Sequence, residues 1–374
     1  MITINSIIKS VHNRYQSWLC EHNDFRTKRH IVVFESDDWG SIRMSNKKDW
    51  EELLKLGYAV DERPYERCDT LESSEDLEAL FEVLSKYNDY KGNHPVITAN
   101  MLMTNPDFEK IEKSGYHKYS YEPIADTYSR YNGDVKVLDL MRQGYEAGVF
   151  MPQSHGREHF NVARWMHGLQ SGNEDLLTAF KFGMCGIAPK EHPDQGNKMM
   201  GALRAKNEEE QKQINVIVKE GLWLFEQLWG FSSKSFVAPC YAWNEEIEKI
   251  LAENGVKLIQ TSRAKKETLR SPRQYYYSGQ RNRFNQIYSI RNCTFEPATN
   301  KMETSVEVLM KQIDDTFNRH KVAVFSTHRI NYVGGLSKQN RIKTLASFDE
   351  FLQRLLEEYP DVEFLSSDKL LEVL

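Results

Sequence analysis

The stretch Phe34-Glu35-Ser36-Asp37-Asp38-Trp39-Gly40 places two adjacent carboxylates directly after His30-Ile31-Val32-Val33, a β-branched run that predicts a buried strand. Neighbouring side chains on a strand point to opposite sides, but where a strand ends in a loop both can reach one pocket. Two close carboxylates repel each other unless a cation or a shared proton offsets the repulsion. One of the two could bind a metal while the other stays free as a base. For an Asp-Asp pair taken alone, a solvated loop with a helix-capping Asp is the simpler interpretation.

Apolar runs and amphipathic segments alternate along the chain. The apolar runs predict eight strands, at residues 30–33, 94–100, 148–151, 235–239, 256–260, 286–290, 322–325 and 362–365. Amphipathic segments predict helices at residues 45–56, 74–87, 134–146, 159–169, 173–183, 205–229, 245–254, 303–319 and 346–358. Such alternation is typical of a parallel sheet with helical crossovers, which holds functional residues at the carboxyl ends of its strands. We therefore predict an α/β, barrel-like fold.

The chain has no internal repeat or low-complexity tract that would divide it into several domains. We predict an N-terminal helical extension at residues 1–29 and the barrel at residues 30–374, with an insertion at about 41–147. Within the insertion, residues 103–133 are rich in Tyr, Pro, Asn and Asp, which predicts a long, lid-like loop.

Composition excludes several classes of protein. The 374 residues are 40% hydrophobic and 28% charged with a net charge of −5, so nucleic-acid binding is not expected. The five cysteines are scattered and form no C-x-x-C pair, which argues against a disulfide framework and a cysteine-built zinc site. No apolar run is long enough for a membrane span, and the N-terminal residues lack the pattern of a signal peptide. We therefore expect a cytoplasmic protein.

His155 and His159 form a second candidate pair directly after the strand predicted at 148–151. At a helix start this spacing would place both rings on one face, with Cβ atoms about 5–6 Å apart. Two histidines and one carboxylate form a three-ligand metal site that leaves positions open for water and substrate. A pair of packed or surface histidines is the alternative. The strand context, which the Asp pair shares, favours the metal site.

These motifs resemble those of the polysaccharide deacetylases, carbohydrate esterase family 4. Ser36-Asp37-Asp38 resembles the Asp-Asp pair of the family, and His155-Gly156-Arg157-Glu158-His159 resembles its His-Ser/Thr-x-x-His motif. Pro239-Cys240-Tyr241 resembles its central Pro-aromatic turn, and Ser326-Thr327-His328 resembles its final motif in the histidine only. The order and the strand contexts match across residues 30–330.

The resemblance implies a distorted (β/α) barrel with seven or eight strands and a divalent metal, with zinc as the expected ion. Asp38, His155 and His159 would bind the metal. Asp37 would be the general base that takes a proton from the metal-activated water. His328 would be the general acid that protonates the leaving amine or alcohol.

The sequence departs from the family pattern at several positions. Trp39 separates the Asp pair from Gly40, and Gly156 replaces the Ser or Thr of the His motif. Val237 stands where the family has an arginine that steadies the base. Arg263 and Arg157 are the candidates to replace that arginine.

Residues beside the motifs are candidates for substrate contact, with packing at the barrel rim or a solvated loop as the alternative. They are Trp39, Pro239, Tyr241, Trp243, Arg157 and Arg329.

The motifs together predict a metal-dependent hydrolase that uses metal-activated water to remove an acetyl group from an N- or O-acetylated sugar or glycoconjugate. Acetylated carbohydrate would be its partner. A metal-dependent hydrolase of a non-sugar amide is the first alternative, which the missing arginine and the displaced glycine permit. A non-catalytic, carbohydrate-binding barrel is the second, although binding alone needs neither Asp37 nor His328.

Overall fold

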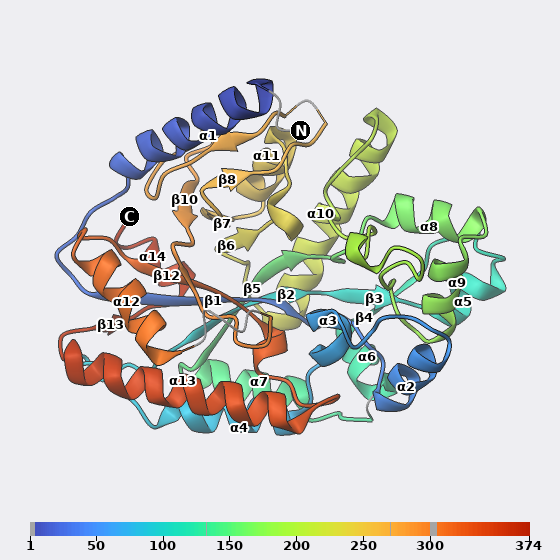
Figure 1. The fold of residues 1–374 in the computed structure, drawn as a ribbon, viewed down its shortest axis with the longest axis horizontal. Helices are drawn as coiled ribbons and strands as arrows, with labels where there is room; N and C mark the ends of the chain where they lie inside the picture. The colour runs from blue at the N-terminus through green and yellow to red at the C-terminus, as the bar shows by residue number, and fades with distance from the viewer. Residues whose placement is uncertain (1–3, 132, 270, 300–304) are drawn as a thin grey trace.

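The computed structural model describes residues 4–131, 133–269, 271–299 and 305–374 (Figure 1). Three small parts of the predicted elements lie outside the described residues. They are residues 1–3 of the extension, residue 132 of the predicted long loop and residues 303–304 of one predicted helix.

The central sheet is parallel, with the strand order β10-β7-β6-β5-β2-β1-β12-β11 and a further strand, β13, paired with β1. Its strands are β1 (Ile31–Trp39), β2 (Ile97–Leu102), β5 (Phe150–Gly156), β6 (Ser235–Val237), β7 (Leu258–Thr261), β10 (Ile287–Ile290), β11 (Cys293–Thr294), β12 (Ala323–His328) and β13 (Glu363–Phe364). All eight predicted strands are present. β11 was not predicted, because two residues carry no periodic signal.

The two edge strands of this sheet, β10 and β11, are separated in the chain only by Arg291 and Asn292. Three Cα–Cα steps of about 3.8 Å span at most about 11 Å, so the sheet must curl until its edges nearly meet. The Arg291 N–H donates to Thr261 O of β7, and the Asn292 N–H donates to Val324 O of β12. The predicted distorted (β/α) barrel is therefore confirmed.

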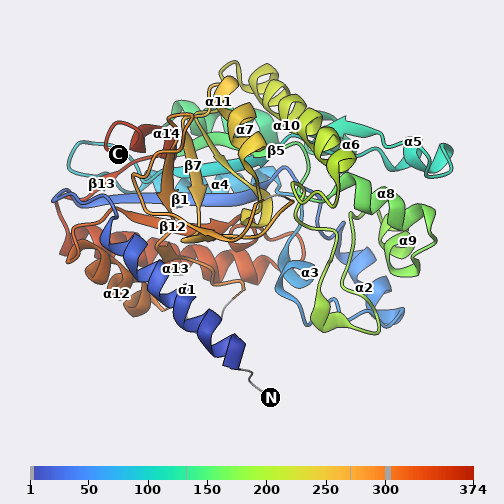
Figure 2. The same ribbon diagram turned by 90° about the horizontal axis from the view of Figure 1, so that it is seen from above.

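Helices cover the outside of the barrel (Figures 1 and 2). On one side, α13 (Lys338–Glu358) packs between α4 (Ser74–Ser85) and α12 (Val306–Phe317), and α7 (Val137–Glu146) packs beside α4. Elsewhere lie α1 (Ile4–His22), α2 (Lys47–Lys55), α3 (Pro64–Cys68), α8 (Val162–Gln170), α9 (Glu174–Lys181), α10 (Glu208–Trp229), α11 (Glu245–Glu253) and α14 (Ser367–Leu370). Side-chain caps start many of them, including Asn46, Ser73, Asn161, Asn207, Asn244, Ser305 and Ser337.

Two predicted segments differ from the structure in this part of the fold. The predicted long loop at 103–133 contains β3 (Thr104–Pro106), α5 (Phe108–Lys113), β4 (Tyr121–Pro123) and α6 (Ile124–Tyr131). Ile124 and Tyr128 of this segment lie in the main hydrophobic core, and Phe108, Tyr116 and Tyr119 pack against a second cluster. The helix predicted at 346–358 begins at Lys338, where Ser337 caps it. None of the helices in the described part of the chain has the length and apolarity that a membrane span requires.

Candidate metal centre and proton-transfer site

Asp37 and Asp38 lie near the carboxyl end of β1 and line the same cavity. The pairing of β1 with β2 is irregular between Ser36 and Trp39, as in a β-bulge, which re-aims side chains locally. Asp38 has φ +76°, a left-handed conformation that costs a non-glycine residue about 1 kcal/mol or more. The irregular backbone explains how two adjacent residues reach one pocket.

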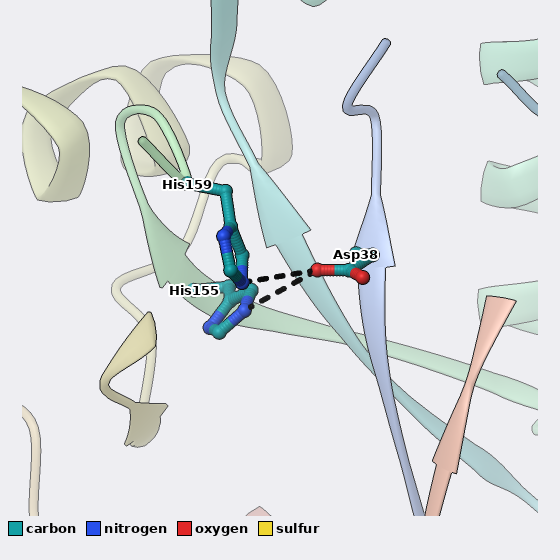
Figure 3. Close-up of side chains that lie close together, drawn as sticks. All are labelled: Asp38, His155 and His159. Atoms are coloured by element: carbon teal, nitrogen blue, oxygen red, sulfur yellow. Dashed lines mark ion pairs between the residues drawn. The ribbon is translucent and has the colours of Figure 1, made fainter. Parts of the chain in front are cut away.

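His155 and His159 approach Asp38 from β5 and from the loop that follows it (Figure 3). The distances from Asp38 Oδ1 are 3.7 Å to His155 Nε2 and 3.3 Å to His159 Nε2. The prediction that a helix presents both rings is wrong, because α8 begins only at Val162. The chain instead turns after β5 at Gly156, whose φ of +114° suits glycine.

The ligand-type atoms of these three residues suit a divalent metal. One atom from each side chain lies within 4.8 Å of the other two, and the site is largely buried. His155 Nδ1 lies 2.8 Å from Val237 O, to which it can only donate, so its Nε2 is left as an acceptor. Asp38 Oδ1 and His155 Nε2 are buried and have no hydrogen-bond partner among the described residues. Burial lowers the pKa of His159 to about 3 against the opposing charge of Asp38, so this ring is neutral.

Asp37 differs from Asp38 because both of its oxygens accept hydrogen bonds. Arg291 donates from Nη1 to Oδ2 and from Nη2 to Oδ1, both at 2.7 Å, and Asn100 Nδ2 donates to Oδ1 at 2.8 Å. Burial raises the pKa of Asp37, but the charge and hydrogen bonds of Arg291 outweigh burial and lower the pKa to about 2. Asp37 is therefore ionised at neutral pH.

Arg291 also binds a second buried carboxylate. Its Nε donates to Glu35 Oε2 at 2.7 Å, and its Nη1 donates to the Tyr241 hydroxyl at 3.0 Å. Burial raises the pKa of Glu35 in spite of the opposing charge of Arg291, and the Ser367 hydroxyl donates to its other oxygen. One guanidinium thus joins Asp37, Glu35 and Tyr241 inside the barrel.

Arg291, and neither Arg263 nor Arg157, contacts the predicted base. Arg263 donates to both oxygens of Asp24, at 2.6 and 2.7 Å, and Arg157 pairs with Glu158. The expectation that Arg263 or Arg157 replaces the missing arginine is therefore wrong. The position of Arg291 just after a predicted strand was the available signal, because polar residues after strands mark this edge of the sheet.

His328 ends β12, and the register of the sheet pairs it with Asp37. Its Nδ1 donates to Glu296, which also accepts from Asn331 Nδ2 at 2.8 Å. Its Nε2 faces Asp37 Oδ2 at 3.9 Å. Burial lowers the pKa of His328, but the charge and hydrogen bond of Glu296 outweigh it and raise the pKa to about 9. Sequence reasoning missed Glu296, since the strand before it is only two residues long.

Arg43 is a further charged residue at the site. Its Nη2 donates to Asp38 Oδ2 at 2.8 Å, and its guanidinium lies over the Tyr65 ring, 5.4 Å from the centroid. Burial raises the pKa of Asp38, but the charge of Arg43 outweighs it and holds the pKa well below its usual range. Arg43 therefore compensates the charge of Asp38 and leaves Oδ1 free for a ligand. Nothing in the local sequence indicated this role.

One cavity, with a volume of about 260 Å³, is lined by Asp37, Asp38, Arg43, His155, His159 and His328. Of the six residues predicted to contact substrate, Tyr241 lines it and the other five do not. Trp39, Trp243 and Pro239 are buried in packing. Arg329 is fully buried and pairs with Asp69 and Glu72.

Hydrogen bonds and ion pairs inside the protein hold three of these side chains away from the cavity. The Trp39 indole donates to Ser36 Oγ at 2.9 Å, and the Trp243 indole donates to Glu248 Oε1 at 2.8 Å. Arg157 is also buried, with Glu158 and Glu220 as its ion-pair partners. Trp39 and Trp243 therefore pack inside the protein, as the packing alternative predicted. Arg157 and Arg329 are both held in internal ion pairs.

The sequence matches no family model, and no curated protein matches it. Solved structures with similar chain traces include 4-α-glucanotransferase from Thermococcus litoralis, with 12% identity, a TM-score of 0.46 and coverage of 92% of this chain and 40% of that one. The peptidoglycan deacetylase PdaC from Bacillus subtilis has 8% identity, a TM-score of 0.38 and coverage of 92% and 91%. A CE4 family pseudoenzyme from Bacillus anthracis has 10% identity, a TM-score of 0.37 and coverage of 92% and 66%.

The structural neighbours therefore include members of the family that the sequence motifs resemble, at low identity. The chain spans 40% of the length of the glucanotransferase. TM-scores below 0.5 at such identities establish no activity, so the function of this chain has to be argued from its own side chains.

Proposed function

We propose that this protein is a metal-dependent hydrolase that removes an acetyl group from an N- or O-acetylated sugar or glycoconjugate. One observation carries the proposal: a three-residue cluster of metal-ligand type, a clamped carboxylate and a carboxylate-held histidine line one cavity. The cluster is Asp38, His155 and His159, and the other two groups are Asp37 and His328.

Asp38, His155 and His159 would hold the metal. Imidazole and carboxylate ligands suit zinc, which we propose as the ion. When bound, a divalent metal lowers the pKa of water and polarises an acyl carbonyl. Three protein ligands leave open positions for water and substrate.

Asp37 would take a proton from the attacking water. Arg291 and Asn100 hold the carboxylate in place and keep it ionised, and its Oδ2 faces His328. A base must be deprotonated when it acts, and the lowered pKa of Asp37 meets this condition.

His328 would donate a proton from Nε2 to the leaving nitrogen or oxygen as the acyl bond breaks. Glu296 accepts from Nδ1, which fixes the ring and keeps it protonated at neutral pH. Because Nε2 lies 3.9 Å from Asp37 Oδ2, the proton acceptor and the proton donor face the same part of the cavity.

A non-sugar amide is the second candidate substrate, and the cavity wall favours it. Of the Phe, Tyr and Trp side chains in the described part of the chain, only Tyr65 and Tyr241 line the cavity, while Trp39 and Trp243 are buried elsewhere. Sugar rings commonly stack on exposed aromatic side chains. With two tyrosines in its lining, the cavity offers few such surfaces for a sugar ring.

A panel of acetylated sugars, O-acetyl esters and simple acetamides tests the proposal by acetate release. We expect release by zinc-loaded protein and its loss after chelation or in His155→Ala. His167→Ala is the matched control, because His167 is exposed on α8. The preferred compound separates the two substrate classes. Failure of zinc-loaded, folded protein to release acetate from any compound would contradict the proposal.

A further inference from the structure

Helix α1 exposes apolar side chains on one face. Val11, Tyr15 and Trp18 have exposed fractions of 62%, 55% and 52%, and they are three of the ten large apolar side chains that are exposed in the described part of the chain. Their spacing of four and three residues places them on the same face of the helix. Tyr15 and Trp18 stack with ring centroids 6.1 Å apart. We call this face the α1 apolar face.

On the opposite side of α1, two polar residues face the protein. Asn13 and Gln16 line a surface cleft together with Gln274 and Tyr275 of β9 (Gln274–Tyr275), and both are partly buried. An amphipathic helix of a globular protein normally buries its apolar side. In α1 the orientation is reversed, because Val11, Tyr15 and Trp18 are exposed.

The end of α1 is anchored firmly to the barrel. Asp24, just after the helix, accepts from both Nη atoms of Arg263, from Lys321 Nζ at 2.9 Å and from the Ser278 N–H at 2.9 Å. From this anchor the helix runs outward, so that its N-terminal end lies away from the barrel (Figure 2). The fold thus fixes the orientation of the helix and leaves the α1 apolar face accessible.

Charge separates this segment from the rest of the protein. Residues 1–29 contain five Lys or Arg and two Asp or Glu, a net +3, whereas the whole chain is −5 and the remainder therefore −8. Arg14, Arg26 and Lys28 are exposed and form no ion pair with another described side chain. Glu21 and Asp24 are neutralised by Arg or Lys partners. The extension is thus the cationic part of an acidic protein.

We propose that α1 binds the surface of a membrane that contains anionic lipids. Tyr15 and Trp18 would enter the interfacial region, where amphipathic aromatic rings are favoured, and Arg14 on the same helix would contact anionic headgroups. The helix lies in the interface and does not span the bilayer. This inference is independent of the proposed catalytic function, because it rests on residues that do not line the cavity.

Co-sedimentation of the full-length chain with lipid vesicles tests it. We expect binding to vesicles of phosphatidylcholine and phosphatidylglycerol, weak binding to phosphatidylcholine alone, and weakening by salt. Tyr15→Asp with Trp18→Asp is expected to reduce partitioning at least about tenfold, and Arg14→Glu about fivefold or more. Trp223→Asp and Lys343→Glu are the matched controls, because both residues are exposed on other helices, α10 and α13.

Unfolding midpoints establish that each variant is folded. Absence of vesicle binding by the wild type would overturn the proposal, as would an equal loss in Trp223→Asp. Sedimentation velocity tests the alternative that the α1 apolar face binds a second copy of the chain. A dimer that Tyr15→Asp with Trp18→Asp dissociates, without vesicle binding, would overturn the membrane proposal in favour of self-association.

Discussion

Asp37 and Asp38 are adjacent in the chain and line one cavity, yet their surroundings differ. Both oxygens of Asp37 accept hydrogen bonds from Arg291. Only Oδ2 of Asp38 is bound, by Arg43, while Oδ1 faces two histidine rings without a hydrogen-bond partner among the described residues. Asp37 is therefore held by protein donors at both oxygens, whereas Asp38 keeps one oxygen that can bind a metal ion.

His159 and His328 also have different surroundings, which give the two rings different protonation states. His159 is neutral because burial lowers its pKa to about 3, and a neutral imidazole can ligate a metal. His328 is cationic because Glu296 outweighs burial and raises its pKa to about 9, and a protonated imidazole can donate a proton. One side of the cavity is thus suited to hold a cation and the other to transfer protons.

Substitution of Asp37 is the strongest test of the separation between the metal-binding side and the proton-transfer side of the cavity. Asp37→Asn is expected to lower kcat about 10²–10⁴-fold, the usual contribution of a general base, with zinc binding unchanged. Acetate release and metal content measure the two effects separately. Asp139→Asn is the control, because Asp139 is exposed on α7. A wild-type kcat in Asp37→Asn would contradict the assignment of the base.

Removal of the arginine clamp is expected to reduce stability. Arg291→Met leaves Glu35 and Asp37 buried without their guanidinium partner, and such a loss typically costs about 3–5 kcal/mol of unfolding free energy. Urea denaturation measures it. Arg142→Met removes an exposed pair with Asp139 and should change stability by about 1 kcal/mol or less. Equal losses in the two variants would show that the clamp is not a buried ion-pair network.

A smaller effect is expected from the carboxylate behind His328. Glu296→Gln keeps a hydrogen-bonding side chain but removes the charge that raises the pKa of His328 to about 9. The general acid acts only when protonated, so the alkaline limb of kcat/KM should move to lower pH. A pH–rate profile measures this shift. An unmoved alkaline limb would mean that His328 is not the acid.

The same substitution has a consequence for stability. A pKa raised in the folded state stabilises the protein fully below the ordinary value of 6.5, and this contribution is lost as pH rises through about 9. Glu296→Gln should therefore be less stable than wild type at pH values below about 6.5, and the difference should shrink above about 9. Urea denaturation across this pH range measures the change.

The sequence predicted the residues that follow long strands. Asp37, Asp38, His155 and His328 each come near the end of a predictable strand, and parallel topology brings strand ends together. Alternation of strands and helices likewise predicted the barrel, which the strand order confirms.

Contacts across the barrel could not be predicted from local patterns. Arg291 lies in the short link between β10 and β11, the two edge strands of the sheet. It reaches Asp37 because the sheet curls and brings these two edges close together. The helical geometry assumed for His155 and His159 is wrong because a turn at Gly156 replaces it. Trp39 and Trp243 were candidates for substrate contact, and their internal hydrogen bonds with Ser36 and Glu248 place them in the packing.

Zinc binding by two neighbouring variants tests the central claim most directly. Titration of metal-free wild type, Asp37→Asn and Asp38→Asn measures stoichiometry and affinity side by side. One zinc per chain in the wild type and in Asp37→Asn, with binding lost in Asp38→Asn, is the predicted result. No binding by the folded wild type, or an equal loss in both variants, would contradict the division of this site into a metal side and a proton-transfer side.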